Sequence, residues 1–242
     1  MAQYHILQIA KYLTIVARVQ KIDNVVLKRF NRQKVKRKER VIHVSFLIVC
    51  EGEKTEPNYF KKFDRKCGNV IFEIICDGQG YNTLRVVEEA MKRKRLNQYF
   101  RVWVVIDKDD FPDNSFNAAI QKAQSNDIGC AWSNEAFELW YLMHFQFRNT
   151  PMSRDDYKRK IEDELRKNIP DFVYKKNSTE MYDILNKYGN QEQAINYAEK
   201  LSQMYNNLNY ASHNPRTQVY ELVKQLNRKD EILEDEIKKL FE

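Results

Sequence analysis

The sequence predicts an α/β fold in which a mostly parallel, Rossmann-like sheet is flanked by helices and followed by a helical C-terminal region. Three observations support this prediction. Short apolar runs rich in β-branched residues alternate with amphipathic segments as far as about residue 147, as in successive βαβ units. Beyond that point strand signals stop and helical patterns continue. The chain also has only 6 glycines and 5 prolines among 242 residues, too few for an all-β protein with many turns.

The first predicted strand covers residues 41–50, VIHVSFLIVC. An apolar run of this length indicates a strand that is buried on both faces, as in a parallel sheet. Residues 51–57 end the strand, and a helix is expected over residues 58–67. Thr55 is a suitable N-cap for that helix, with Pro57 in its first turn.

The remaining elements of the α/β part alternate in the same way. Apolar runs predict three more strands, and the segments between them carry one apolar face each. In chain order these elements are a strand at 70–76, a helix at 82–98, a strand at 101–106, a helix capped by Ser115 that ends near Asn126, a strand at 128–132 and an aromatic-rich helix at 136–147.

Three regions follow from this pattern: a basic N-terminal arm at 1–40, an α/β core at 41–150 and a helical region at 151–242. Right-handed crossovers between consecutive strands would place helices on both faces of the sheet. The helices expected in the last region cover 153–168, 179–187, 191–207, 215–228 and 230–241.

Charge is concentrated in residues 28–40, KRFNRQKVKRKER. The segment holds eight basic residues and one acid, so it carries a net charge of +7, equal to that of the whole chain. Such an arm suits a nucleic-acid backbone, because each pairing of Lys or Arg with a phosphate releases a counterion. The alternative is a solvated linker. The nucleic-acid-binding candidates are Lys34, Lys36, Arg37, Lys38 and Arg40.

Acidic residues follow two of the predicted strands. Glu51 comes directly after the first strand, and Asp107 and Asp109 follow the third in the stretch VVIDKDD. In open α/β sheets the functional crevice lies beyond the carboxyl ends of the strands, so we expect these three side chains to meet there. Carboxylates gathered in one crevice favour a hard cation, Mg²⁺ or Mn²⁺. The alternative is that they are ordinary turn residues.

Other polar residues are candidates for the same crevice. Glu138 lies one helical turn beyond Asn134 and so shares its face, which makes it a stronger catalytic candidate than Glu135. His144 is more simply a structural histidine than a general acid. Glu56 and Glu53 are readily explained as acids at the start of a helix, although Glu53 is kept as a lining candidate. The further lining candidates are Asn134, Asn214 and Thr217, and Lys175 and Lys176 are phosphate-contact candidates.

Several longer stretches are similar to a known family. Strand-Glu-Gly followed by strand-Asp-x-Asp resembles the Toprim fold of topoisomerases, primases and OLD-type nucleases, and the fuller stretches resemble its RloB-like branch. The resemblance extends over about residues 43–226. It is carried by LIVCEGEKTEPNYF (47–60), VWVVIDKDDF (102–111), NEAFELWYLMHF (134–145), QAINYAEKL (193–201) and NPRTQVYELVKQL (214–226).

The resemblance implies a metal-dependent phosphoryl-transfer site and a role in bacterial defence against phage, including abortive infection. Residue by residue, it implies that Glu51 binds metal or acts as acid or base, and that Asp107 and Asp109 are Mg²⁺ ligands. Glu138 is the expected fourth catalytic residue. The implied partners are nucleic acid and a separate ATPase subunit.

The leading hypothesis is an Mg²⁺-dependent nuclease that acts on nucleic acid, with RNA or tRNA among the candidate substrates. The chain lacks the GxxxxGK[ST] loop of P-loop ATPases. One alternative is a non-catalytic effector that binds nucleic acid or a partner, and another is a primase-like nucleotidyl transferase. The oligomeric state stays open, a homo-oligomer included.

Cysteine usage and hydropathy bear on the cellular compartment. The chain has 4 cysteines with no Cys-x-x-Cys pair, and three of them lie in apolar runs. This favours free buried thiols in a reducing cytoplasm over disulfides or a zinc site. No stretch approaches the roughly 18 apolar residues that span a bilayer. We therefore expect a cytoplasmic protein without membrane association or a secretory signal.

Overall fold

The computed structural model describes residues 42–63, 66–67, 70–78, 80, 82–227, 235–237 and 239. The basic segment 28–40, with its five nucleic-acid-binding candidates, lies outside this part of the chain. Most of the helix expected over 230–241 lies outside it as well.

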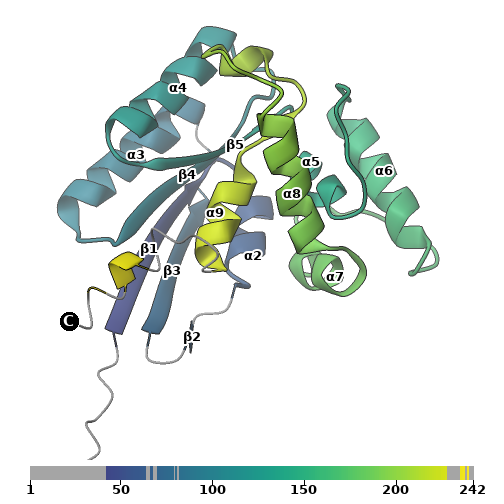
Figure 1. Ribbon diagram of the computed structural model, residues 1–242, viewed down its shortest axis with the longest axis horizontal. Helices are drawn as coiled ribbons and strands as arrows, with labels where there is room; N and C mark the ends of the chain where they lie inside the picture. Colours follow the sequence, from purple (N-terminus) through teal and green to yellow (C-terminus); the bar gives the residue numbers. More distant parts are fainter. Residues whose placement is uncertain are drawn as a thin grey trace, which may run out of the picture. The chain divides into compact units, whose positions relative to one another are not determined.

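The core of the fold is a six-stranded sheet whose four long strands run parallel to one another (Figure 1). The short strands at its two edges pair antiparallel with their neighbours. The predicted α/β fold with a mostly parallel sheet is therefore confirmed. In spatial order the strands are β2 (Lys66–Cys67), β3 (Val70–Gly78), β1 (Ile42–Cys50), β4 (Arg101–Asp107), β5 (Gly129–Asn134) and β6 (Arg216–Thr217).

Successive side chains of the central strands point to opposite faces of the sheet, so one part of the core lies on each face. On β1, Leu47 and Val49 pack with α3 and α4, whereas Phe46 and Ile48 pack with α2 and the helices of the C-terminal region. All four side chains are fully buried. This two-sided burial explains the apolar run in the sequence, because a strand covered on both faces has no side for polar residues.

Several helix ends differ from those that the sequence pattern predicts. Thr55 and Ser115 lie inside α2 and α4 and do not cap them. Residues 66–67 form a strand in place of the expected helix end, and residues 216–217 form β6 where helix was expected. The helices are α2 (Thr55–Phe60), α3 (Thr83–Leu96), α4 (Asp113–Ser125), α5 (Glu138–Met143), α6 (Arg154–Arg166), α7 (Met181–Tyr188), α8 (Gln191–Ser202) and α9 (Val219–Leu226), with a 3₁₀ turn η1 (Tyr210–Ser212).

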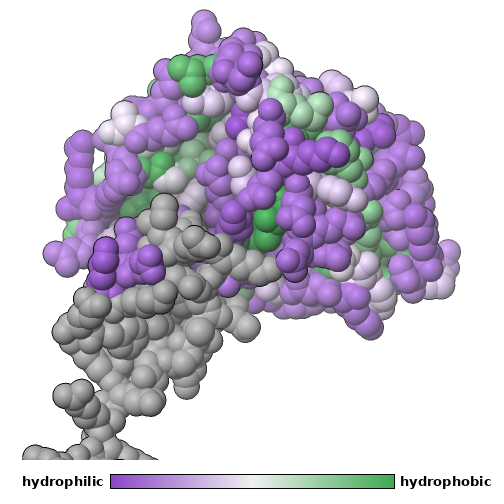
Figure 2. Space-filling model, in the orientation of Figure 1, coloured by the Kyte–Doolittle hydropathy of each residue, from purple (hydrophilic) through white to green (hydrophobic). Residues whose placement is uncertain are grey.

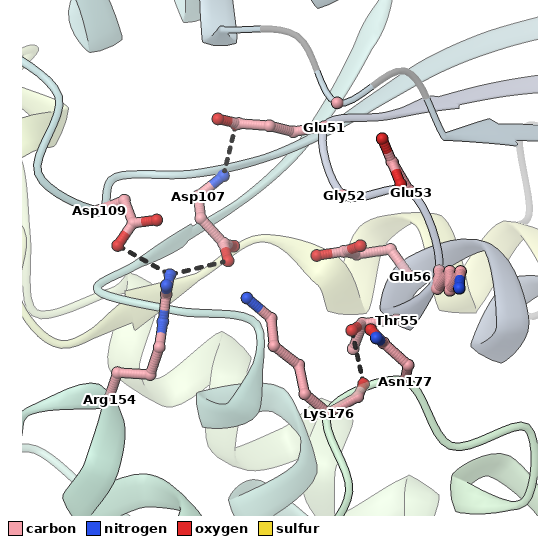
Figure 3. A pocket seen from close by; sticks show the side chains of 12 residues that line it. Glu51, Gly52, Glu53, Thr55, Glu56, Asp107, Asp109, Arg154, Lys176 and Asn177 are labelled. Atoms are coloured by element: carbon pink, nitrogen blue, oxygen red, sulfur yellow. Dashed lines mark hydrogen bonds and ion pairs between the residues drawn. The ribbon is translucent and has the colours of Figure 1, made fainter.

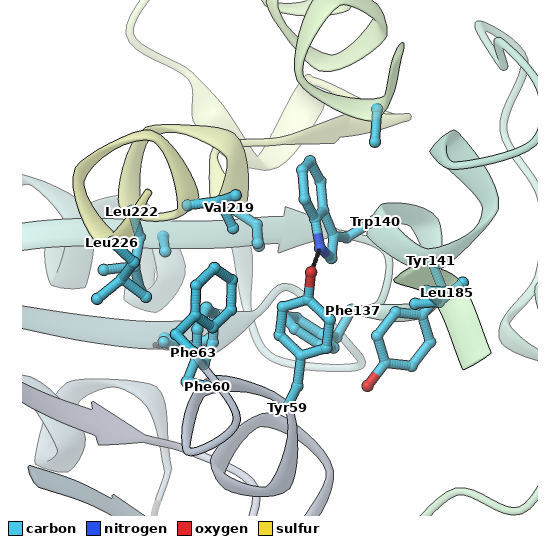
Figure 4. Close-up of a cluster of buried hydrophobic side chains, with 14 of the residues drawn as sticks. Tyr59, Phe60, Phe63, Phe137, Trp140, Tyr141, Leu185, Val219, Leu222 and Leu226 are labelled. Carbon is cyan, nitrogen blue, oxygen red and sulfur yellow. Dashed lines mark hydrogen bonds between the residues drawn. The ribbon is translucent and has the colours of Figure 1, made fainter. Parts of the chain in front are cut away.

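An aromatic cluster joins the helical region to the sheet (Figure 4). Tyr59 of α2 lies at its centre, in edge-on or tilted contact with Phe137 and Tyr141. The Trp140 indole N–H donates to the Tyr59 hydroxyl at 2.9 Å in a buried hydrogen bond. Leu185 of α7 and Leu222 of α9 belong to the same buried cluster, so the C-terminal helices and the sheet share one core.

The visible face of the described part is mostly hydrophilic, with apolar residues in small separate patches (Figure 2). Single exposed hydrophobic side chains are ordinary on a protein surface. In the described part of the chain, the large exposed hydrophobic residues are Leu96, Val173, Met204 and Leu208.

Candidate functional site

A pocket of about 450 Å³ lies where β1 and β4 end (Figure 3). The two strands are parallel neighbours, with Cys50 in register with Val105, so the residues that follow them emerge at the same edge of the sheet. This arrangement brings Glu51, Asp107 and Asp109 together. The lining residues are Glu51, Gly52, Glu53, Lys54, Thr55, Glu56, Gly80, Asp107, Asp109, Arg154, Lys176 and Asn177.

Asp107 lies at the centre of the carboxylate cluster. Its backbone N–H donates to Glu51 Oε2 at 3.3 Å, and its own Oδ2 accepts from the Phe137 backbone N–H at 3.1 Å. Its second oxygen, Oδ1, is buried without a hydrogen-bond partner in the described part of the chain. A buried carboxylate oxygen left unpaired is unfavourable, and a bound cation or proton would relieve that cost.

Asp109 has a backbone conformation that few residues adopt. Its φ angle is 42°, in the left-handed region that aspartate tolerates better than bulky residues. Its N–H donates to the Glu135 carbonyl at 3.2 Å, which ties the turn after β4 to the end of β5. The turn thereby directs the Asp109 carboxylate into the pocket beside Asp107 (Figure 3).

Glu56 is a pocket residue that sequence reasoning assigned to a helix start. It does lie in the first turn of α2, but its side chain is only 7% exposed. Its Oε2 has no hydrogen-bond partner among the described residues. A Cβ atom at Gly52 would come within 2.1 Å of that oxygen, so glycine is required there for Glu56 to fold back into the pocket.

Two cationic side chains reach the pocket from the helical region. Arg154, the first residue of α6, places Nη2 2.8 Å from Asp109 Oδ1 and 3.8 Å from Asp107 Oδ2. The Lys176 amine points toward the space between Asp107 and Glu56 (Figure 3). No sequence pattern pointed to Arg154, because it stands in the highly charged stretch RDDYKRK, which is typical of an exposed helix.

The backbone near Lys176 is bonded to α2. The Thr55 hydroxyl donates to the Lys176 carbonyl at 2.6 Å, and the Asn58 amide donates to the Asn177 carbonyl at 3.1 Å. The predicted capping role of Thr55 is therefore wrong: its hydroxyl joins two regions more than 100 residues apart in sequence.

Burial raises the pKa of three of the carboxyl groups. The pKa of Glu51 rises to about 7, mainly through burial, with the charge of Glu56 adding to it. Burial and then the charge of Glu138 raise the pKa of Glu56 to about 7. The pKa of Asp107 is raised well above its usual range by burial and the charges of Glu56, Glu138 and Glu51, although Arg154 opposes this. Without a bound cation, these carboxyl groups therefore retain protons at a pH where isolated carboxyl groups are ionised.

The donor chemistry of the pocket fits a hard divalent cation. Every acidic group is a carboxylate, and two buried carboxylate oxygens, Asp107 Oδ1 and Glu56 Oε2, have no described partner. Within the described ranges, however, no three His, Cys, Asp or Glu side chains are gathered as metal ligands. Arg154 is the cation that pairs with Asp107 and Asp109 in this arrangement.

Several other candidates lie away from the pocket. Glu138 is 2% exposed and accepts a hydrogen bond from the Tyr174 hydroxyl at 3.0 Å, so it lies behind the pocket and influences Asp107 and Glu56 through its charge. The Asn134 amide donates to the Ala211 carbonyl, and Thr217 bonds Ser133. Like Asn134 and Thr217, Asn214 does not line the pocket, whereas Glu53 does, from an exposed position.

His144 is a buried structural histidine, as the sequence favoured. It is 1% exposed, and its Nδ1 lies 3.0 Å from the Trp140 carbonyl, so Nδ1 carries the hydrogen. Nε2 is buried without a partner in the described part of the chain. Burial lowers the pKa of His144 to about 4, opposed by hydrogen bonds to the Trp140 and Tyr141 backbone.

A pH-dependent loss of stability follows from this environment. The unfolded chain binds a proton at His144 near pH 6.5 and the folded chain only near pH 4, so the stability present above pH 6.5 is lost as the pH falls. The expected loss from this group between pH 7.5 and 5 is about 2 kcal/mol. In His144→Asn, an amide can replace Nδ1–H, and urea unfolding at both pH values should show a smaller loss than in wild type. Equal losses in the two proteins would contradict this assignment.

Comparison with known proteins gives one match. The model of a family described as RloB-like protein matches residues 46–226, which include the second half of β1, the whole pocket and the C-terminal helices through α9. No curated protein and no solved structure matches the chain. Among the described residues, no helix combines the length and apolar character needed to cross a membrane.

Proposed function

This chain belongs to the RloB-like protein family, and on that premise we propose that it is an Mg²⁺- or Mn²⁺-dependent nuclease of a bacterial antiphage defence system. One observation carries the proposal. Carboxyl groups from two neighbouring parallel strands meet in a pocket, where burial and their mutual repulsion raise the pKa values of Glu51 and Asp107. A divalent cation would neutralise these carboxylates more completely than a single arginine does.

Asp107 and Asp109 are the residues that would hold the ion, and Glu51 beside them would act as the acid or base. When bound, a divalent ion makes the phosphorus of a phosphodiester more electrophilic and lowers the pKa of nearby water. Glu51, with a pKa of about 7, is suited to accept the proton of the attacking water, because a general base works best near the ambient pH. Attack forms one P–O bond, the bond to the leaving oxygen breaks, and that oxygen then takes up a proton.

The direct test is a cleavage assay with the purified full chain. End-labelled single- and double-stranded DNA, single-stranded RNA and a folded tRNA are each incubated with Mg²⁺, with Mn²⁺ and with EDTA. Cleavage of at least one substrate with either ion, and none with EDTA, is the expected result. Cleavage that persists in EDTA would reject the metal-dependent mechanism. Addition of nucleotides would reveal the primase-like alternative as incorporation.

A non-catalytic effector is the second candidate, and the pairing of Arg154 with Asp109 and Asp107 favours it. An internal arginine can neutralise strand-end acids permanently, in which case the pocket needs no metal. That function predicts binding of nucleic acid or of a partner without cleavage of any substrate. Because an ATPase subunit is the expected partner, the assay is repeated with the ATPase encoded beside this gene, where one exists, before cleavage is judged absent.

A further inference from the structure

Arg154 is held at the pocket by the start of α6. The Ser153 hydroxyl accepts the Asp156 backbone N–H at 3.2 Å, and Asp156 Oδ2 accepts the Ser153 backbone N–H, so a capping box fixes the first turn of the helix. The Arg154 side chain is 24% exposed, and its guanidinium projects between the carboxylates of Asp107 and Asp109 (Figure 3). A long side chain anchored in this way can change its partner without moving the helix.

In this arrangement, neither the Arg154 guanidinium nor the Asp107 carboxylate makes all the hydrogen bonds that it can form. Arg154 Nε is buried with no partner in the described part of the chain, and Nη2 reaches Asp107 Oδ2 only at 3.8 Å. On the other side, Asp107 Oδ1 is buried and unpaired. A guanidinium that fully matched these acids would form two parallel hydrogen bonds with a carboxylate. With Asp109, Arg154 makes only one such hydrogen bond, from Nη2 to Oδ1 at 2.8 Å.

Lys176 is the second cation on this side of the pocket. The two hydrogen bonds from α2 hold its backbone, while its amine forms no ion pair within the described residues and points between Asp107 and Glu56. Arg154 and Lys176 therefore face the strand-end acids from the helical region. Two cations opposite a carboxylate cluster can bind the oxygens of a phosphate whose other side contacts a metal ion.

We propose that Arg154 exchanges partners: it is the counter-ion of Asp107 and Asp109 in the metal-free protein and, with Lys176, binds the substrate phosphate once a divalent ion occupies those acids. The ligand of this half of the site is a phosphodiester group. The inference rests on the proposed function, because the exchange requires the same ion. It assigns the helical region a direct part in substrate binding.

The first measurement is binding of Mn²⁺ alone, followed by electron paramagnetic resonance or calorimetry. Arg154→Gln removes the competing cation, so its affinity for Mn²⁺ should exceed that of the wild type by roughly tenfold. Arg159→Gln is the matched control: it makes the same change of charge on the same helix, at a side chain that is 74% exposed and does not line the pocket. Its affinity should equal that of the wild type.

The second measurement is binding of inorganic phosphate to protein saturated with Mg²⁺. Arg154→Gln and Lys176→Gln should each weaken phosphate binding roughly tenfold or more, and Arg159→Gln should leave it unchanged. Arg154→Lys keeps the charge but loses the guanidinium fork, so it should recover part of the phosphate affinity. If Arg154→Gln does not fold, Arg154→Lys still shows whether the guanidinium contributes to phosphate binding.

The outcomes separate the two proposals. If the wild type binds no Mn²⁺, the proposed nuclease function fails and the exchange fails with it. If the wild type binds Mn²⁺ but Arg154→Gln binds it no more tightly than Arg159→Gln, Arg154 is a fixed structural ion pair and only the exchange is overturned. Unchanged phosphate binding in both Arg154→Gln and Lys176→Gln would overturn the assignment of the phosphate contact.

Discussion

Asp107→Asn is expected to reduce metal-dependent cleavage by at least a hundredfold while making the metal-free protein more stable at neutral pH. The loss of activity follows because an amide is a poor ligand for a hard divalent cation. Asparagine keeps the shape of the side chain, and its oxygen can still accept the Phe137 backbone N–H that Asp107 accepts at 3.1 Å. It removes one charge from a cluster in which burial and three neighbouring acids raise the pKa of Asp107.

The sign of the stability change depends on pH. An acid whose pKa is raised in the folded state stabilises the protein below its unfolded pKa, near 4 for aspartate, and loses that contribution as the pH rises. The melting temperature of Asp107→Asn should therefore exceed that of the wild type by several degrees at pH 7.5, and the difference should disappear near pH 4. Asp107→Ala would not isolate the effect of the charge on the melting temperature, because it also leaves the Phe137 N–H unpaired.

Thermal melts with and without Mg²⁺ complete the test of Asp107. A bound ion stabilises the folded state by mass action, so Mg²⁺ should raise the melting temperature of the wild type and that of Asp107→Asn much less. Glu53→Gln is the matched control, because Glu53 lines the same pocket from an exposed position. If Asp107→Asn melts lower than the wild type without metal and gains as much from Mg²⁺, Asp107 has a structural role only.

Trp140→Ala should have the largest effect on folding, a loss of about 4 kcal/mol in the free energy of unfolding. Trp140 is completely buried in the cluster that joins α5 to the sheet and to the C-terminal helices. The substitution empties a large volume and leaves the Tyr59 hydroxyl without the indole N–H that donates to it. Urea denaturation measures the loss.

Trp140→Phe is the milder substitution at this position. It keeps one aromatic ring in the cluster but removes the donor to Tyr59 and part of the indole volume, so its cost should lie below that of alanine. Tyr59→Phe removes the other partner of the same hydrogen bond. If Trp140→Ala costs less than about 1 kcal/mol, this cluster does not hold the helical region to the sheet.

The sequence determined the central sheet well. The runs at 41–50 and 101–106 correspond to β1 and β4 within one residue, because a strand buried on both faces can hold almost only apolar residues. The adjacency of Glu51, Asp107 and Asp109 followed from the same pattern, since parallel strands end at one edge of the sheet. Helix starts were less predictable. Thr55 and Ser115 are residue types that often cap helices, but the Thr55 hydroxyl bonds the Lys176 carbonyl, and α4 begins directly after Pro112.

What only the tertiary structure decided is the second half of the pocket. Arg154 lies more than 40 residues beyond Asp109 in a charged stretch that carries no local signal. Lys176 was a phosphate-contact candidate whose position the sequence left open. Packing of the helical region brings both residues to the carboxylates. The inward position of Glu56 depends likewise on the space above Gly52. The two-residue strand β6 forms because β5 offers it an edge to pair with, a condition that no local pattern expresses. Alternation and strand ends are properties of neighbouring residues, whereas these contacts depend on how distant segments pack.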